Sequence, residues 1–596
     1  MASRPLGPQY RQDATSTLRS TELDVLVVGG GVTGAGVALD AVTRGLRVGL
    51  VEARDFAAGT SSRSSKLIHG GLRYLEQKDF TLVHEALRER SLMLRSLAPH
   101  LVRPVPFLLP LQHRVWERGY IGAGVTLYDV MAGLGGSRVV PHHKQLTRRG
   151  ALKLAPGLRP DALVGAIQYY DAQVDDARHT LTIARTAAEY GATLLTSARV
   201  TGYLRDRNRV VGATVKDLES GEEFAVRAKR VIAATGVWSN EVQELAGAHR
   251  SFSVKASKGV HILVRRDRID LHSGMILRTE KSVLFVIPWG SHWIIGTTDT
   301  PYDLDKAHPA ASSADIDYIL DHVNAVLRSP LSREDIVGTY AGLRPLLSGD
   351  ADDTAKLSRE HTVAEPAPGL VIVAGGKYTT YRVMAKDAVD FATRNFRHPV
   401  PASVTETLPI LGAVGYQALR NQREQLATRY GIPVERVDHL LSRYGSGIPE
   451  LMDLIGGDPS LGQPLSGAPD YLRVEIAYAA SHEAALHLED VLTRRTRISV
   501  EEPDRGVAVA EEVAAILAEV LGWDAATVRR EVDHYRARVE AELAASSEPD
   551  EAVAQQIRLA AGDILDRYGS AAQDAEPAKA SESPAAPGVA PPAKVG

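Results

Sequence analysis

Near its amino terminus the chain reads Leu23-Asp24-Val25-Leu26-Val27-Val28-Gly29-Gly30-Gly31-Val32-Thr33-Gly34. The apolar run at residues 23–28 predicts a buried strand, and the glycines that follow it predict a tight turn. Residues 37–43 have helix-forming character, and a second apolar run occupies residues 47–51. Strand, turn, helix and strand in this order indicate the first unit of an α/β fold.

The glycines of this turn have the spacing of a Rossmann-like dinucleotide site. Gly29 permits the tight turn, Gly31 lets the backbone approach a pyrophosphate, and Gly34 allows the helix to pack closely on the strand. Glu52, at the end of the next strand, can accept hydrogen bonds from ribose hydroxyls. Glycine-rich turns also arise for purely structural reasons, but the strand, helix and acid in register favour dinucleotide binding.

Two further apolar runs end in glycine turns. Residues 230–234 are closed by Thr235 and Gly236, and residues 370–374 by Gly375 and Gly376. Because the carboxyl ends of parallel strands share one edge of a sheet, we expect all three turns to face one ligand. The stretch that ends at Thr235-Gly236 looks like the strand end that flanks FAD in two-dinucleotide-fold flavoproteins, although a mere turn remains the alternative.

The composition restricts the chemistry. The chain has 596 residues, 69 Lys or Arg against 73 Asp or Glu, and no cysteine. Thiolate-held metals, iron–sulfur clusters, disulfides and a catalytic thiol are therefore excluded, so redox chemistry needs an organic cofactor or a partner. We expect no metal site. The net charge of −4 argues against broad nucleic-acid binding.

Patterning divides the chain into four expected segments. Strand-like runs such as residues 282–288 and 292–296 suit an antiparallel sheet over the ligand, and patterns such as 474–493 and 509–521 are helical. The segments are a flexible lead-in at 1–20, an FAD-binding domain interleaved with a substrate domain at 21–400, a helical domain at 401–569, and a disordered Ala/Pro-rich tail at 570–596.

The most informative motif is Gly59-Thr-Ser-Ser-Arg63-Ser64-Ser-Lys66-Leu-Ile-His69-Gly70-Gly71-Leu72-Arg73-Tyr74-Leu-Glu76. It resembles the FAD-dependent glycerol-3-phosphate dehydrogenases, the respiratory enzymes that pass electrons to quinone. The resemblance covers residues 21–522. Further matches are Val174-Asp175-Asp176-Ala177-Arg178, Phe285-Val286-Ile287-Pro288-Trp289, Gly296-Thr297-Thr298-Asp299, Gly342-Leu343-Arg344-Pro345-Leu346, Gly375-Gly376-Lys377-Tyr378-Thr379-Thr380-Tyr381-Arg382, Arg443-Tyr444-Gly445-Ser446 and Leu492-Thr493-Arg494-Arg495-Thr496.

The resemblance implies a fold and an activity. The fold is α/β, a Rossmann-like FAD-binding domain with an antiparallel-sheet cap domain of the glycine/D-amino-acid oxidase type and a helical C-terminal domain. The activity is oxidation of sn-glycerol 3-phosphate to dihydroxyacetone phosphate by hydride transfer from C2 to flavin N5, with electrons passed to a membrane quinone. A soluble oxidase that reduces dioxygen, acting on glycerol 3-phosphate or on an amine, and a non-catalytic FAD-binding interaction protein remain alternatives.

A phosphate dianion needs several fixed cations, and the rigid fork of arginine suits it better than the point charge of lysine. Motif-like segments offer such groups, although a surface ion pair is the simpler explanation for any one arginine. The expected substrate-binding residues are Arg73, Tyr74, Arg344, Arg359 and Lys377.

The oxidation also needs a group that takes the hydroxyl proton. His69, next to Gly70-Gly71, and His261, in a segment that also resembles the family, are the two candidates, since an ordinary histidine can accept a proton at neutral pH. Either could instead be a hydrogen-bonded core residue. With Arg344 they form the expected catalytic set. Ser64 and Lys377 are assigned to the FAD site as well.

Residues 101–160 carry nine Lys or Arg against two acids, a net charge of +7, interleaved with aromatic and aliphatic residues. Such a surface can meet anionic headgroups, while a solvated basic face is the alternative. No apolar run reaches the ~20 residues of a spanning helix. We expect a cytoplasmic protein held peripherally on the inner face of the cell membrane, with glycerol 3-phosphate and a quinone as partners. A homodimer stays open.

Overall fold

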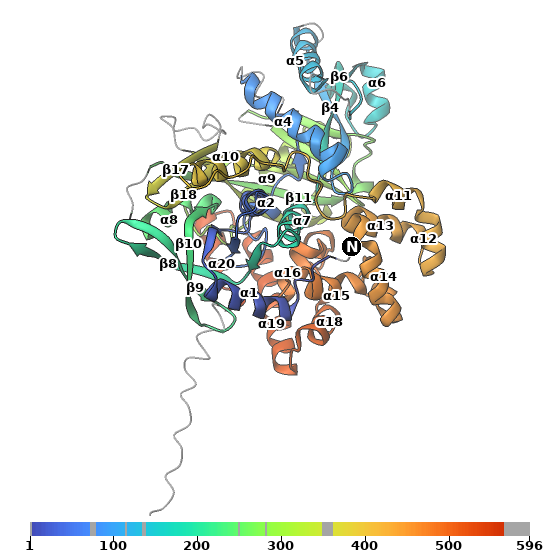
Figure 1. Cartoon of the computed structure of the whole chain (residues 1–596). Helices are drawn as coiled ribbons and strands as arrows, with labels where there is room; N and C mark the ends of the chain where they lie inside the picture. The colour runs from blue at the N-terminus through green and yellow to red at the C-terminus, as the bar shows by residue number, and fades with distance from the viewer. Residues whose placement is uncertain are drawn as a thin grey trace, which may run out of the picture.

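The computed structural model describes residues 3–71, 79–113, 116–133, 139–247, 251–280, 283–347 and 361–565. Two large sheets form the first two thirds of the chain, and helices drawn in orange and red lie beneath and beside them (Figure 1). The chain passes back and forth between the sheets, because strands of the first sheet both precede and follow strands of the second.

The first sheet carries the dinucleotide turn. Within the described residues it has eight strands, with the order β17-β18-β10-β1-β2-β7 and with β8 and β9 at the side of β10. The neighbours β18, β10, β1, β2 and β7 run parallel, which confirms the predicted parallel sheet. Its strands are β1 (Leu23–Val28), β2 (Val48–Val51), β7 (Thr193–Leu195), β8 (Ala198–Asp206), β9 (Arg209–Asp217), β10 (Glu223–Ala233), β17 (His361–Ala367) and β18 (Leu370–Gly375).

The second sheet is the expected antiparallel layer. Among the described residues it has ten strands, nearly all antiparallel to their neighbours. They are β3 (Leu67–Ile68), β4 (Arg103–Leu111), β5 (Lys144–Thr147), β6 (Gly165–Gln173), β11 (Val254–Arg265), β12 (Gly274–Arg278), β13 (Val283–Trp289), β14 (His292–Gly296), β15 (Thr300–Tyr302) and β16 (Ile336–Leu347).

Helices cover both faces of the second sheet. On β11, Val260 and Ile262 pack with α9 (Ser313–Asn324) and α6 (Arg148–Leu154). Leu263 packs on the other face with α4 (Phe80–Leu92) and α5 (Trp116–Gly133). Since side chains alternate along a strand, His261 lies on the face opposite Val260 and Ile262.

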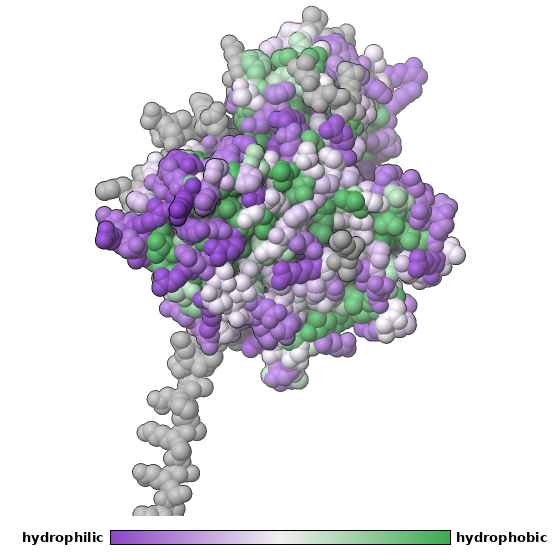
Figure 2. Space-filling view, viewed as in Figure 1, coloured by the Kyte–Doolittle hydropathy of each residue, from purple (hydrophilic) through white to green (hydrophobic). Residues whose placement is uncertain are grey.

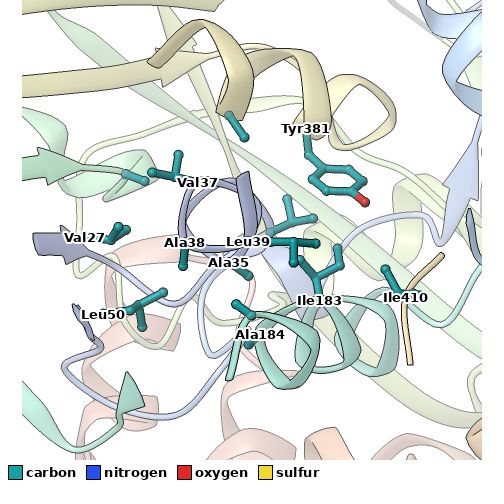
Figure 3. Packing of buried hydrophobic residues seen from close by; sticks show 14 of the residues in the cluster. Val27, Ala35, Val37, Ala38, Leu39, Leu50, Ile183, Ala184, Tyr381 and Ile410 are labelled. Carbon is teal, nitrogen blue, oxygen red and sulfur yellow. The ribbon is translucent and has the colours of Figure 1, made fainter. Parts of the chain in front are cut away.

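Helix α2 (Val32–Thr43) forms the centre of the main core. It lies between α7 (Asp176–Glu189) and α10 (Tyr381–Thr393), against β1 and β2 (Figure 3). A Cβ at Gly36 would stand 2.9 Å from the Tyr381 ring, so the missing side chain lets α10 approach. Leu50 and Ile183 are completely buried here, and each contributes about 1.5–3 kcal/mol. This packing fixes the turn after β1.

The amino-terminal segment is not the flexible lead-in that the sequence suggested. Helix α1 (Pro8–Ser20) packs on β7 and β10, and its Leu18 is fully buried. Leu6 is buried as well and forms a bridge with Glu483. Burial of Leu6 and Leu18 holds residues 3–20 in place. The residues between these two leucines are mostly polar, so the hydrophobic pattern of the sequence did not indicate this packing.

The C-terminal part is helical, as predicted. Residues 474–493 do not form one helix, because the chain turns at Ala484 (φ +57°). The turn places the buried Glu483 carboxylate against Arg178 and Arg185 of α7. The helices are α11 (Tyr416–Asn421), α12 (Arg423–Tyr430), α13 (Val434–Tyr444), α14 (Ile448–Gly457), α15 (Arg473–His482), α16 (Leu488–Asp490), α17 (Ile498–Glu501), α18 (Ala510–Leu521), α19 (Ala525–Ala545) and α20 (Glu551–Leu559).

The remaining predictions concern the C-terminal tail and membrane-spanning helices. The tail at residues 570–596 lies outside the described residues. In the part of the chain that the structure describes, every helix is too short or too polar to cross a bilayer.

Candidate active site

A cavity of about 700 Å³ lies between the two sheets. Its first wall consists of the turns that follow β1, β10 and β18, so the three predicted glycine turns do share one space. Its second wall comes from β11 and β16 of the second sheet, and residues 58–69 close one side. A ligand in this cavity would touch both sheets at once.

The turn after β1 is built for close backbone approach. Gly29 has φ +110°, and a Cβ there would stand 2.6 Å from the Ala234 carbonyl oxygen. A Cβ at Gly34 would stand 1.9 Å from the Gly29 carbonyl oxygen. Gly31 caps the start of α2, where the helix dipole favours negative charge. This geometry is that of a pyrophosphate cradle.

Glu52 lines the cavity and also braces the turn. Its carboxylate accepts hydrogen bonds from the Gly30 amide at 2.5 Å and from the Arg54 amide at 2.9 Å. Burial raises the pKa of this carboxyl, against the effect of those two amides. A carboxylate has further acceptor capacity, so bracing is compatible with the predicted ribose contact.

The other turns add polar groups. The hydroxyl of Thr235 is buried and has no hydrogen-bond partner among the described residues. Gly236, Gly375 and Gly376 all have positive φ, and the last two precede the short helix at Tyr378–Thr380. Ser64 lies in the same wall, where both its amide and its hydroxyl donate to Asp176.

His261 and Arg344 face the cavity from the paired strands β11 and β16. The guanidinium of Arg344 donates to Thr298 O at 3.1 Å, Thr297 Oγ1 at 3.2 Å and Asp299 at 3.3 Å. A Cβ at Gly259 would stand 2.5 Å from this guanidinium, so glycine is required beside it. The hydrogen bonds fix the fork in place.

His261 is buried and neutral at pH 7. Its Nε2 and the Ser65 hydroxyl are hydrogen-bonded at 2.9 Å, and its ring stacks on Tyr340 with centroids 4.7 Å apart. Burial lowers the pKa of His261 well below the ordinary value, and the nearby charges of Arg344 and Lys66 lower it further. The neutral ring therefore has a free lone pair at neutral pH, while burial disfavours the charged imidazolium that proton transfer would form.

The remaining predicted site residues separate into two groups. His69 and Lys377 line the same cavity, and the His69 backbone exchanges hydrogen bonds with Thr379. Arg73, Tyr74 and Arg359 lie outside the described residues.

Sequence reasoning gave no role to Ser65, Lys66, Asp176 or Arg497. Ser65 contacts His261, and Lys66 is an almost fully buried cation, 2% exposed, that is paired with Asp176. The available signal was the position of Lys66 and Asp176 inside family-like motifs. A motif shows that a residue matters, but it does not show which residue it contacts.

The residues present fit FAD. The glycine cradle suits a pyrophosphate, the unpartnered Thr235 hydroxyl offers a polar contact, and the cavity continues to a wall with two histidines and two cations. A nicotinamide enzyme of the simple kind would not need the second and third glycine turns. Fold and cavity together define an FAD-dependent oxidoreductase.

Comparison with known proteins narrows this class. A sequence profile of the FAD dependent oxidoreductase family matches residues 24–390, and one described as the C-terminal domain of alpha-glycerophosphate oxidase matches residues 403–528. Glycerol-3-phosphate dehydrogenase 2 of Mycobacterium bovis is 59% identical over 93% of this chain and 94% of its own. The human mitochondrial glycerol-3-phosphate dehydrogenase is 36% identical over 94% of this chain and 79% of its own.

A solved structure agrees. The glycerol-3-phosphate dehydrogenase from Bacillus halodurans complexed with FAD superimposes with a TM-score of 0.74 at 29% identity, covering 91% of this chain and 99% of that one. The chain therefore belongs to the FAD-dependent glycerol-3-phosphate dehydrogenase family, and its cofactor is FAD.

Proposed function

We propose that the protein oxidises sn-glycerol 3-phosphate to dihydroxyacetone phosphate, with a membrane quinone as the final electron acceptor. The observation that carries the proposal is one cavity that joins a dinucleotide cradle to a wall with Arg344, Lys377, His69 and His261. The names of the relatives at 59% and 36% identity support the substrate. FAD, when bound, supplies the two-electron acceptor for the hydride at C2.

The substrate phosphate binds to the basic part of this wall. Arg344 offers a guanidinium whose orientation Thr297, Thr298 and Asp299 already fix, which reduces the entropy lost on binding. Lys377 adds a second charge. Arg73, Tyr74 and Arg359, outside the described residues, remain predicted members of the same phosphate site.

His261 takes the proton of the C2 hydroxyl, directly or through the Ser65 hydroxyl. In the neutral state the Ser65 hydroxyl can donate to Nε2 and use its own lone pairs to accept from the substrate. As the hydride leaves C2, the hydroxyl proton passes to the imidazole and a carbonyl forms, so charge and atoms balance. His69 is the second candidate, because it lines the same cavity.

The end of the molecule that carries α5 and α6 contacts the membrane. Trp116, Tyr120 and Val130 of α5 are each more than half exposed. Arg148, Arg149 and Lys153 of α6 are exposed nearby, and Figure 1 shows both helices at the same extremity. Figure 2 shows hydrophobic and hydrophilic residues mixed there. Aromatic groups beside cations suit the interface of an anionic bilayer.

Steady-state turnover tests the proposal. The holoenzyme is assayed with a short-chain quinone or with dioxygen, each against glycerol 3-phosphate, glycerol, glycine and sn-glycerol 1-phosphate. We expect rapid quinone reduction only with glycerol 3-phosphate, and slow peroxide formation. Fast peroxide formation would favour an oxidase, turnover of glycine would favour an amine oxidase, and no turnover at all would favour a binding protein.

A further inference from the structure

The C-terminal domain sends one arginine to the loop that borders the active site. Arg497 immediately precedes α17 and is 3% exposed. Its guanidinium donates to Asp176 at 2.7 Å, to Asp175, and to the Ser62 carbonyl oxygen at 3.3 Å. These acceptors all belong to the FAD-binding part of the chain. The contacts therefore join two domains at one point.

Asp176, the partner of Arg497, also accepts hydrogen bonds from the loop at residues 64–66. It is completely buried at the first turn of α7. Besides Arg497, its carboxylate accepts from the Ser64 amide at 2.9 Å, the Ser64 hydroxyl at 2.7 Å and the Lys66 ammonium at 2.8 Å. The Ala177 amide donates to it as well, at 3.0 Å, and a buried carboxylate with five charged or polar donors has little freedom to move.

The contacts to Ser64 and Lys66, which we call the clamp, hold Ser65 in place from both sides. Ser65 stands between Ser64 and Lys66, and Lys66 holds a left-handed conformation with φ +57°. The Tyr340 hydroxyl donates to the Ser64 carbonyl oxygen at 3.0 Å, and the Tyr340 ring stacks on His261. The Ser65 hydroxyl is thereby held at 2.9 Å from His261 Nε2.

We propose that Arg497 is a positioning residue of the active site, which acts through Asp176 to hold Ser65 against His261. The inference rests on the proposed function, because it takes His261 as the proton acceptor. It gives the C-terminal domain a role in catalysis beyond packing. The reaction would need this domain docked, since one of the donors to Asp176 is Arg497 of the C-terminal domain.

Two predictions separate positioning from general stabilisation. Without Arg497 the Ser65 hydroxyl should move, and misplacement by about 1 Å can lower a rate roughly a hundredfold. Arg344, Lys66 and the Tyr340 ring face His261. Removing the positive charge of Arg497 would leave Asp175 and Asp176 less neutralised, so the surroundings of His261 should become more negative. The proton affinity of His261 should then rise.

The test is anaerobic stopped-flow reduction of the bound flavin by glycerol 3-phosphate, in wild type, Arg497→Gln, Arg497→Lys and Arg185→Gln. Arg185 is the matched control, because it is buried and joins α7 to Glu483 and Tyr478 of the C-terminal domain without touching residues 62–66. We expect Arg497→Gln to reduce the limiting rate roughly tenfold to a hundredfold, with half-saturation changed less than about threefold.

Arg497→Lys should recover part of the rate, and Arg185→Gln should keep it while losing thermal stability. The acid limb of the rate against pH should move to higher pH in Arg497→Gln alone.

Equal limiting rates and pH profiles in Arg497→Gln and wild type, or the same loss in Arg185→Gln, would overturn the inference. If Arg497→Gln does not fold, Ser65→Ala must show the same rate loss and shifted limb. Failure of wild type to be reduced would instead contradict the proposed function.

Discussion

Arg344 combines charge with a fixed direction. Three hydrogen-bond acceptors, Thr297, Thr298 and Asp299, hold its guanidinium, and Gly259 leaves room for it. A lysine at the same position would keep the charge but could not present two parallel donors to a phosphate. The shape of the side chain is therefore as important here as its charge.

Arg344→Lys should weaken transition-state binding by about 1–3 kcal/mol, the range of a charge-assisted hydrogen bond. The measurement is kcat/KM for glycerol 3-phosphate in the FAD-loaded enzyme. Arg333→Lys, an exposed arginine paired with Asp317, serves as the control and should change nothing. An unchanged kcat/KM in Arg344→Lys would exclude Arg344 from the proposed phosphate site.

Sequence patterns found some site residues and missed the links between them. Gly29, Glu52, His261 and Arg344 stand in short motifs, and the structure brings all four to one cavity. The clamp on Ser65 could not be predicted, because Arg497 and Asp176 are 321 residues apart in the chain. Such a contact exists only after the two domains have docked.

The turn between β1 and α2 depends on the absence of a side chain. At Gly34 a Cβ would collide with the Gly29 carbonyl oxygen, so Gly34→Ala must displace either the strand end or the helix. We expect loss of most bound FAD, measured as the absorbance ratio of flavin to protein after purification. Gly124→Ala in α5, where a Cβ meets no atom of the described residues within 4 Å, should retain full occupancy. Equal occupancy in both variants would place the pyrophosphate elsewhere.

Helix α6 offers a direct test of membrane contact. Changing Arg148, Arg149 and Lys153 to Glu should abolish co-sedimentation with anionic liposomes, since each basic residue contributes about 1 kcal/mol near such a surface. Wild-type binding should rise with anionic lipid and fall with salt. The matched control changes Arg529, Arg530 and Arg536 of α19, a helix at the opposite end of the molecule in Figure 1, to Glu. Undiminished binding by the α6 variant would contradict a contact through this helix.

Four strands of the first sheet, β1, β2, β10 and β18, were predictable because each is a short apolar run, and three of these runs end in a glycine turn. The expected strand at 23–28 has the observed bounds of β1, and the expected run at 370–374 falls within β18. The break after α15 had no such signature. Ala484 takes its left-handed conformation where the buried Glu483 meets Arg178 and Arg185, and these partners come from a distant helix.

Two buried histidines should make the protein less stable below pH 6.5. Burial lowers the pKa of His100 to about 3 and that of His179 to about 4. Between these values and 6.5 the unfolded chain binds more protons than the folded one, so stability falls as pH falls. His179 alone would contribute about 3 kcal/mol. The pKa of His487 is raised despite burial, because the ring is hydrogen-bonded to Glu219 and Glu531. The stability that His487 contributes is therefore complete below pH 6.5 and is lost only as the pH rises above that value.

Thermal unfolding of the holoenzyme between pH 4.5 and 6.5 checks this prediction. The midpoint of wild type should decrease steadily towards pH 4.5. His179→Gln should show a shallower decrease, because it has no imidazole to protonate. A wild-type midpoint that is constant over this range would contradict the buried neutral histidines.

We propose that FAD binds in the cavity between the two sheets and oxidises glycerol 3-phosphate there. The most direct test of this proposal is the flavin absorbance of the purified protein near 450 nm, followed without oxygen after addition of substrate. We predict complete bleaching by one equivalent of glycerol 3-phosphate, and no bleaching by glycerol or by sn-glycerol 1-phosphate over the same time. A flavin that stays oxidised with glycerol 3-phosphate, or that glycerol reduces at the same rate, would contradict the account.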